Sequence, residues 1–188
     1  DRLTSPTRVE RALCFDAATG APLWTAEYEC SYRKVGYPAG PRACLTLFDA
    51  RAYMLGTMGH LHCLDAATGR TLWKKTPDAD YTIRVPTWGV AAAPLVEDDL
   101  VIVHWGAEGG CLTAFDRKTG RDVWKALDDR PSYSAPAVVE QGGRRVLVCL
   151  TGDNVEALTQ DARSAPVTLP VLLKDPSDAY MEVILDNP

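Results

Sequence analysis

The sequence has no long hydrophobic run. A membrane-spanning helix needs roughly 18 consecutive apolar residues, and no stretch approaches that length, so we expect no transmembrane segment. The first residues, Asp1 to Pro6, contain neither an initiator Met nor the hydrophobic core of a signal peptide. We therefore interpret the sequence as a mature or truncated form whose targeting segment, if there is one, lies outside it.

The sequence also lacks a marked charge of either sign. It has 20 Lys and Arg residues and 25 Asp and Glu residues, a net charge of −5, and the basic residues are scattered along the chain. Proteins that bind nucleic acid concentrate Lys and Arg on one surface to contact phosphates, so we expect no nucleic-acid partner. Hydrophobic residues make up 46% of the chain, which is enough to form a folded core.

No two cysteines are adjacent or arranged as CxxC. The six are widely spaced, at Cys14, Cys30, Cys44, Cys63, Cys111 and Cys149. Free cysteine packs as a small hydrophobic residue, so the spacing favours buried single thiols. A disulfide between Cys30 and Cys44 is the alternative that the sequence leaves open.

A twelve-residue pattern occurs three times, at 13–24, 62–73 and 113–124. Its tryptophans are 49 and then 51 residues apart, so the chain is built from repeats of about fifty residues. Each copy has an apolar run ending in Asp, a Thr-Gly turn and a second run ending in Trp. The key positions are Asp16, Gly20 and Trp24; Asp65, Gly69 and Trp73; and Asp116, Gly120 and Trp124.

The pattern is typical of a β-hairpin. The Asp carboxylate can accept hydrogen bonds from backbone N–H groups of the turn, and the Gly can adopt a positive φ. The Trp then supplies a large apolar surface that can pack one hairpin against the next unit.

Two further strand-like runs lie upstream of the hairpins. Residues 92–96 and 100–105 form one such pair, and residues 134–139 and 145–150 form the next. Four strands per fifty residues, with no segment of helical period between them, are typical of a β-propeller blade. The predicted fold class is therefore all-β, with blades of four antiparallel strands, and the first unit is expected to lack its two inner strands.

The Asp-x-x-Thr-Gly pattern followed by Trp resembles the tryptophan-docking motif of pyrroloquinoline-quinone (PQQ) type propellers. That family includes quinoprotein alcohol dehydrogenases and the propeller lipoprotein of the outer-membrane assembly machinery. The resemblance implies a partial ring of a seven- or eight-bladed propeller and a periplasmic or exported location.

The fourth unit departs from the motif. Thr159, Ala162, Arg163 and Val167 occupy the places of Asp, Thr, Gly and Trp. We therefore expect residues 1–160 to form about three and a half blades, and residues 161–188 to form an irregular tail or an incomplete blade.

Two functions follow as hypotheses from the resemblance. The first is a non-catalytic scaffold that binds a protein or polymer partner. The second is part of a PQQ-dependent, alcohol-dehydrogenase-like oxidoreductase, which would use PQQ and Ca²⁺. The sequence lacks the adjacent cysteines that such enzymes often carry, and its candidate cofactor residues are Trp88, Asp153 and Asn154. His60 and His62 could share one face of a strand, but a polar blade edge is the favoured interpretation.

Loops between blades commonly carry binding function. The loop after the first hairpin is aromatic and basic, and the loop over residues 78–88 has the same place one repeat later. The candidate binding residues are Tyr28, Tyr32, Arg33, Lys34, Tyr37, Arg42, Tyr81 and Arg84. Because the ring is incomplete, we also expect missing blades or self-association to close it.

Overall fold

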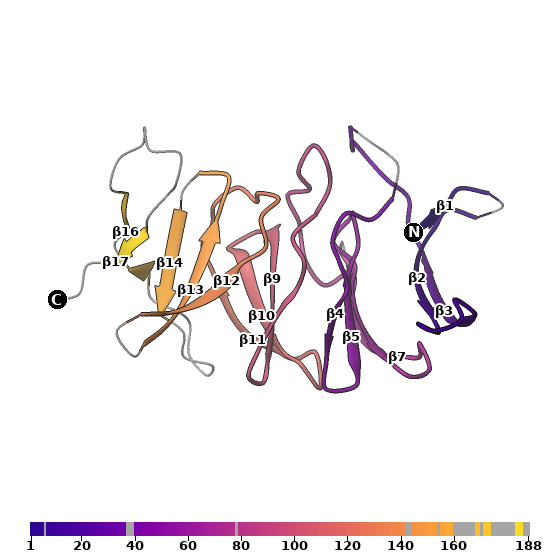
Figure 1. Cartoon of the computed structure of the whole chain (residues 1–188). Helices are drawn as coiled ribbons and strands as arrows, with labels where there is room; N and C mark the ends of the chain where they lie inside the picture. Colours follow the sequence, from indigo (N-terminus) through magenta and orange to yellow (C-terminus); the bar gives the residue numbers. More distant parts are fainter. Residues whose placement is uncertain are drawn as a thin grey trace.

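The computed structural model describes residues 1–5, 7–36, 40–77, 79–141, 144–153, 155–159, 168–169, 171–173 and 183–185. Every regular element within these ranges is a β-strand, and the strands form successive sheets that lie side by side (Figure 1). Within the same ranges, no helix is long and apolar enough to cross a membrane.

The sheets follow the order of the repeats, and each is antiparallel. Blade 1 contains β1 (Arg2–Leu3), β2 (Val9–Phe15) and β3 (Pro22–Glu29). Blade 2 contains β4 (Thr46–Phe48), β5 (Arg51–Leu55), β6 (Leu61–Asp65) and β7 (Thr71–Lys75). Blade 3 contains β8 (Leu95–Glu97), β9 (Leu100–Ala107), β10 (Gly110–Asp116) and β11 (Asp122–Ala126). Blade 4 contains β12 (Ala137–Gln141), β13 (Arg144–Leu150), β14 (Val155–Thr159) and β15 (Thr168–Leu169), and a last hairpin joins β16 (Val171–Leu173) to β17 (Val183–Leu185).

This architecture confirms the predicted fold class. The chain is all-β and forms part of a propeller that is built from four-stranded antiparallel blades. One expectation about blade 1 was wrong in part. Blade 1 does contain one short inner strand, β1, in which Arg2 and Leu3 pair with Glu10 and Val9 of β2.

The inner strands of blades 3 and 4 begin later than the apolar runs suggested. They start at Leu95 and Ala137, directly after Pro94 and Pro136. Proline has no backbone N–H to donate to a sheet, so these strands start beyond it.

The last two strands of blades 1, 2 and 3 share one irregularity. In blade 2, Cys63 pairs with Trp73, and the register then shifts so that Leu64 pairs with Thr71. Equivalent shifts occur in blades 1 and 3. The extra residue is a β-bulge, which bends the outer strand directly before the tryptophan.

The core lies in the joints between blades. Between blades 2 and 3, a cluster of buried residues includes Tyr53, Trp105 and Phe115, and Trp73 packs against it. Smaller clusters fill the joints between blades 1 and 2 and between blades 3 and 4. Burial of these apolar faces is the main stabilisation of such an array, because no blade can cover its own faces.

The fourth sheet is completed without the hairpin motif. β15 pairs with β14 through Leu169 opposite Ala157 and Thr168 opposite Leu158. Ala162, Arg163 and Val167, which replace the motif residues, lie outside the described part of the chain.

All six cysteines are free thiols in the structure, so it contains no Cys30–Cys44 disulfide. Cys30 is buried and Cys44 is exposed. Cys63, Cys111 and Cys149 are also buried, consistent with the packing interpretation.

Candidate functional site

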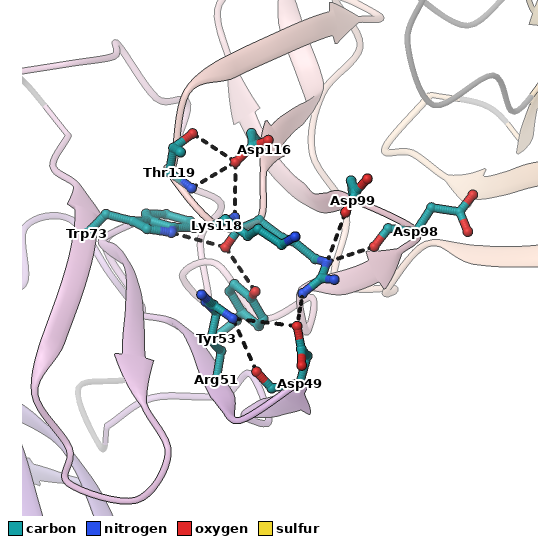
Figure 2. Close-up of polar contacts among 10 residues, drawn as sticks. Asp49, Arg51, Tyr53, Trp73, Asp98, Asp99, Asp116, Lys118 and Thr119 are labelled. Atoms are coloured by element: carbon teal, nitrogen blue, oxygen red, sulfur yellow. Dashed lines mark hydrogen bonds and ion pairs between the residues drawn. The ribbon is translucent and has the colours of Figure 1, made fainter.

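The hairpin turns are held by their aspartates (Figure 2). The Asp116 carboxylate accepts hydrogen bonds from the backbone N–H groups of Lys118 (3.1 Å) and Thr119 (2.8 Å) and from the Thr119 hydroxyl (2.8 Å). Asp16 and Asp65 make the same contacts in their own turns. Hydrogen bonds to the charged form keep the pKa of Asp65 below its ordinary value, with the Thr68 hydroxyl as the largest cause.

The turns of blades 2 and 3 each form a docking site for the tryptophan of the preceding blade. The Trp73 indole N–H donates to the Arg117 carbonyl at 3.1 Å, and the Tyr53 hydroxyl donates to the same oxygen at 3.0 Å (Figure 2). A Cβ atom on Gly120 would lie 2.7 Å from the Trp73 ring. The docking site therefore consists of a carbonyl for the indole N–H and a glycine beneath the ring.

The joint between blades 1 and 2 repeats this arrangement. Trp24 donates to the Ala66 carbonyl at 3.0 Å, and a Cβ atom on Gly69 would lie 2.6 Å from its ring. Gly69 and Gly120 both have a φ of +73°, which L residues rarely adopt. Glycine is thus required at these positions both by the backbone and by the indole ring.

Arg117 was not singled out by sequence reasoning. Its side chain donates to the Asp49 carboxylate at 2.7 Å and to the Asp98 carbonyl at 2.9 Å, so it links turns of blades 2 and 3 (Figure 2). The other two copies of the motif have Ala17 and Ala66 at this position. The replacement of alanine by arginine was the available signal.

The first candidate binding loop is fixed by a buried carboxylate. Glu10 is fully buried and accepts hydrogen bonds from the hydroxyl groups of Tyr28 and Tyr32 and from the Thr57 N–H at 3.2 Å. Burial and the adjacent Glu10 charge raise the pKa of Tyr28 far above its usual value, so this phenol stays protonated and donates. Tyr28 and Tyr32 therefore anchor the loop.

Arg42 has a similar anchoring role. Its guanidinium donates to the Gly40 carbonyl and to the Thr57 hydroxyl, the latter at 3.2 Å. Tyr37 lies outside the described residues. Among the described candidate binding residues of this loop, Arg33 and Lys34 are exposed.

The second candidate loop is anchored too. The Tyr81 hydroxyl donates to Asp122, and its ring centroid lies 4.9 Å from that of Trp105. Arg84 donates to the Asp128 carboxylate at 3.0 Å, which ties the loop to the end of blade 3. Five of the eight predicted binding residues therefore make contacts that hold the loops in place.

Trp88 is the large side chain that this loop displays. It is 53% exposed, and nearby Tyr133, from the next inter-blade loop, is 45% exposed. The Trp88 N–H contacts the Tyr133 hydroxyl at 3.4 Å, and the Trp88 ring packs beside Gly36 of the first loop. Three successive inter-blade loops thus meet at Trp88.

The backbone around Trp88 is well supported. The Gly36 N–H donates to the Thr87 carbonyl at 2.7 Å, and the Val90 N–H donates to the Thr57 carbonyl at 2.8 Å. We call Arg33, Lys34, Thr87, Trp88 and Tyr133 the rim surface. Beside it lies a cavity of about 300 Å³ whose lining includes Cys30, His60, Met58, Ile83 and Val85.

The three candidate cofactor residues do not form one site among the described residues. Arg130 donates to both carboxylate oxygens of Asp153, through its backbone N–H and its guanidinium, each at 2.7 Å. A carboxylate neutralised in this way is a poor Ca²⁺ ligand. Asn154 lies outside the described residues, and no contact joins Trp88 to Asp153 within them. Asp153 therefore does not fit the Ca²⁺ ligand that a PQQ site would need.

The histidine pair packs around an aromatic ring. The Tyr28 ring centroid lies 5.0 Å from that of His60 and 4.3 Å from that of His62. Burial lowers the pKa of His62 to about 4, so the imidazole is neutral at pH 7. Among the described residues, no group of three or more His, Cys, Asp or Glu side chains could hold a metal.

These features define a repeat propeller whose blades are joined by tryptophan docking sites. A family model described as outer membrane protein assembly factor BamB matches residues 4–167. The chain belongs to this family, as the hairpin motif indicated.

Similar proteins include both assembly factors and enzymes. This chain is 40% identical to methanol dehydrogenase [cytochrome c] subunit 1 of Methylorubrum extorquens over 76 aligned residues. The alignment covers 39% of this chain and 12% of that protein. Quinoprotein ethanol dehydrogenase of Pseudomonas putida is 28% identical over 130 positions, covering 69% of this chain and 19% of the enzyme. The structure of BamB from Moraxella catarrhalis superposes with a TM-score of 0.59 and 21% identity, covering 85% of this chain and 42% of BamB. The chain thus spans less than half the length of each of these relatives.

Proposed function

We propose that this chain is part of a non-catalytic propeller that binds a protein partner through its rim surface. The observation that carries the proposal is Trp88, which is 53% exposed although its loop is held by hydrogen bonds to two neighbouring segments. The family description, an assembly factor, supports a scaffold function for this chain as well.

Trp88 and Tyr133 have the chemistry of an interface centre. Tryptophan and tyrosine are enriched among the few residues that dominate binding energy. A loop that is ordered before binding loses little conformational entropy when a partner binds. Lys34 extends this surface with a positive charge that suits an acidic segment of the partner.

A quinoprotein oxidoreductase is the second candidate. It is supported by the identity to methanol dehydrogenase subunit 1 over 76 positions. The pairing of Asp153 with Arg130 argues against Asp153 as a metal ligand, so a cofactor would depend on residues elsewhere in a longer protein. For either candidate, we propose a periplasmic or exported location, by analogy with the relatives.

Photo-crosslinking in cells tests the scaffold proposal. A photoreactive residue replaces Thr87 in the complete protein, with Trp88 intact or with Trp88→Ala, and a control places it at the exposed Lys118 in the turn after β10. We expect one discrete product from position 87 that falls about tenfold or more with Trp88→Ala, and none from position 118. A product that does not depend on Trp88, or equal products from both positions, would contradict the proposal.

A further inference from the structure

We propose that the joint between blades 1 and 2 binds a small phenol, whose hydroxyl group pairs with the His62 imidazole and whose ring lies between the two blades. The site is a cavity of about 400 Å³ that is lined by residues of β3, β5, β6 and β7. The residues of the rim surface do not line this cavity, so the proposal is independent of the proposed function.

The lining of the cavity suits a neutral aromatic molecule. Its apolar part consists of Ala26, Tyr28, Met54, Leu64 and Leu72. A thioether and an aromatic ring both make favourable contacts with a second ring. Glu27 and Lys74 are exposed lining residues of opposite charge, so the cavity does not favour an ionic ligand. Mainly apolar walls with a few polar groups are typical of small-molecule sites, and the volume lies in their usual range.

His62 supplies a polar group that is available inside the joint. The residue lines the cavity and is 6% exposed, and its Nδ1 atom is buried without a hydrogen-bond partner among the described residues. Buried polar atoms are nearly always hydrogen-bonded, so this exception points to a ligand. Because the imidazole is neutral at pH 7, Nδ1 either donates or accepts a hydrogen bond. A hydroxyl group can do both, so it matches either form of the ring.

The joint between blades 2 and 3 shows how the equivalent position is satisfied. Thr113 corresponds to His62, because these residues directly precede Ala114 and Cys63, which pair with the docking tryptophans. The indole N–H of Trp105, a fully buried residue, donates to the Thr113 hydroxyl at 3.1 Å. In that joint, an aromatic ring with one hydrogen-bonding group therefore lies beside the equivalent side chain.

The joint between blades 1 and 2 has no such ring from its own strands. The strand pairing places Gly56 at the position of Trp105, so blade 2 has no indole there. The Tyr28 ring lies beside the imidazole, with its centroid 4.3 Å from that of His62, but the Tyr28 hydroxyl donates to Glu10. A phenol would supply to His62 the hydrogen bond that Trp105 supplies to its equivalent.

NMR titration of the complete protein with phenol and with toluene provides the test. The two probes have the same number of non-hydrogen atoms, and only phenol carries a hydroxyl group. With ¹³C-methyl-labelled methionine, we expect phenol to shift the Met54 methyl signal to saturation, and Met54→Leu identifies that signal. Met58 does not line this cavity and provides the reference, so its signal should stay in place.

Two substitutions separate the hydrogen bond from the space. His62→Phe keeps a ring beside Tyr28 and removes the nitrogen, so the ratio of phenol affinity to toluene affinity should fall about fivefold. Ala26→Leu adds side-chain atoms to the lining of the cavity and should abolish the Met54 shift with both probes. Thr25→Leu is the matched control, since Thr25 is an exposed neighbour on the same strand that does not line the cavity.

Three results would overturn the proposal: no saturable shift of the Met54 signal, equal shifts at Met58, or an unchanged affinity ratio in His62→Phe. Binding that survives Ala26→Leu would overturn it as well. If His62→Phe does not fold, the ¹⁵N shift of His62 Nδ1 in the unaltered protein decides. A change with phenol that toluene does not produce supports the proposal, and equal changes or no change overturn it.

Discussion

Blades 1 and 2 carry the same hairpin motif, yet their docking sites have different surroundings. The Gly69 turn is covered by Trp24, while the Gly20 turn has no described atom above it. Both turns keep the same φ and the same Asp hydrogen bonds. The motif therefore determines the conformation of its own turn, whereas the burial of the apolar residues around the turn depends on the neighbouring blade.

We expect the largest difference in unfolding free energy between substitutions at one motif position in two blades. Phe115→Ala should lower the free energy of unfolding by about 3–5 kcal/mol, because a fully buried ring leaves a cavity in the joint between blades 2 and 3. Phe15→Ala should cost about 1 kcal/mol, because half of that ring already contacts water. Urea denaturation measures both, and similar losses would show that blade 1 is covered in solution.

The occupied joint between blades 1 and 2 should respond to pH. The neutral His62 imidazole is favoured in the folded state, where burial lowers its pKa to about 4 from an unfolded value near 6.5. Its contribution is fully present above pH 6.5 and is lost as the pH falls toward 4, by an amount on the order of 3 kcal/mol. His62→Gln should flatten the stability profile in this window, and an unchanged profile would contradict the assignment to His62.

Substitution of the motif glycines separates ring contact from backbone strain. Gly69→Val and Gly20→Val both force a β-branched residue into a left-handed conformation. Only Gly69→Val also places side-chain atoms against the Trp24 ring, so we expect it to cost about 2 kcal/mol more. Thermal and urea denaturation of the two variants provide the difference, and equal costs would mean that Trp24 does not occupy the site in solution.

The smallest effect concerns the indole N–H. Trp73→Phe removes a hydrogen bond to the Arg117 carbonyl, whereas the Trp124 N–H is buried without a partner among the described residues. We expect Trp73→Phe to be about 1 kcal/mol more destabilising than Trp124→Phe. The reverse order in urea denaturation would indicate that Trp124 has a hydrogen-bond acceptor in solution.

The repeat could be predicted from sequence because its signals are local. Asp16, Gly20 and Trp24 lie within one hairpin, and their hydrogen-bonding and backbone requirements depend on residue type. The bulge before each docking tryptophan and the short strand β1 were missed, because no residue pattern marks them. The bulge is a register shift inside a hairpin, and β1 is only Arg2 and Leu3 paired with Glu10 and Val9.

The rim was harder to predict, because its contacts are long-range. Tyr28 and Tyr32 were predicted as binding-loop residues from the composition of the loop. Both donate to Glu10, which lies 18 and 22 residues earlier in the chain. Trp88 lay within the predicted binding loop 78–88 but was named individually only as a cofactor candidate. Its neighbours Gly36 and Tyr133 come from two other loops. Loop composition alone does not distinguish an anchoring aromatic residue from a displayed one.

Titration of the complete protein with PQQ in the presence of Ca²⁺ tests whether the protein is a non-catalytic scaffold. Absorbance spectra and metal analysis follow binding, and an artificial electron acceptor with a panel of alcohols follows turnover. We expect no stoichiometric quinone binding and no dye reduction. Tight, stoichiometric binding with alcohol-dependent dye reduction would contradict a non-catalytic scaffold.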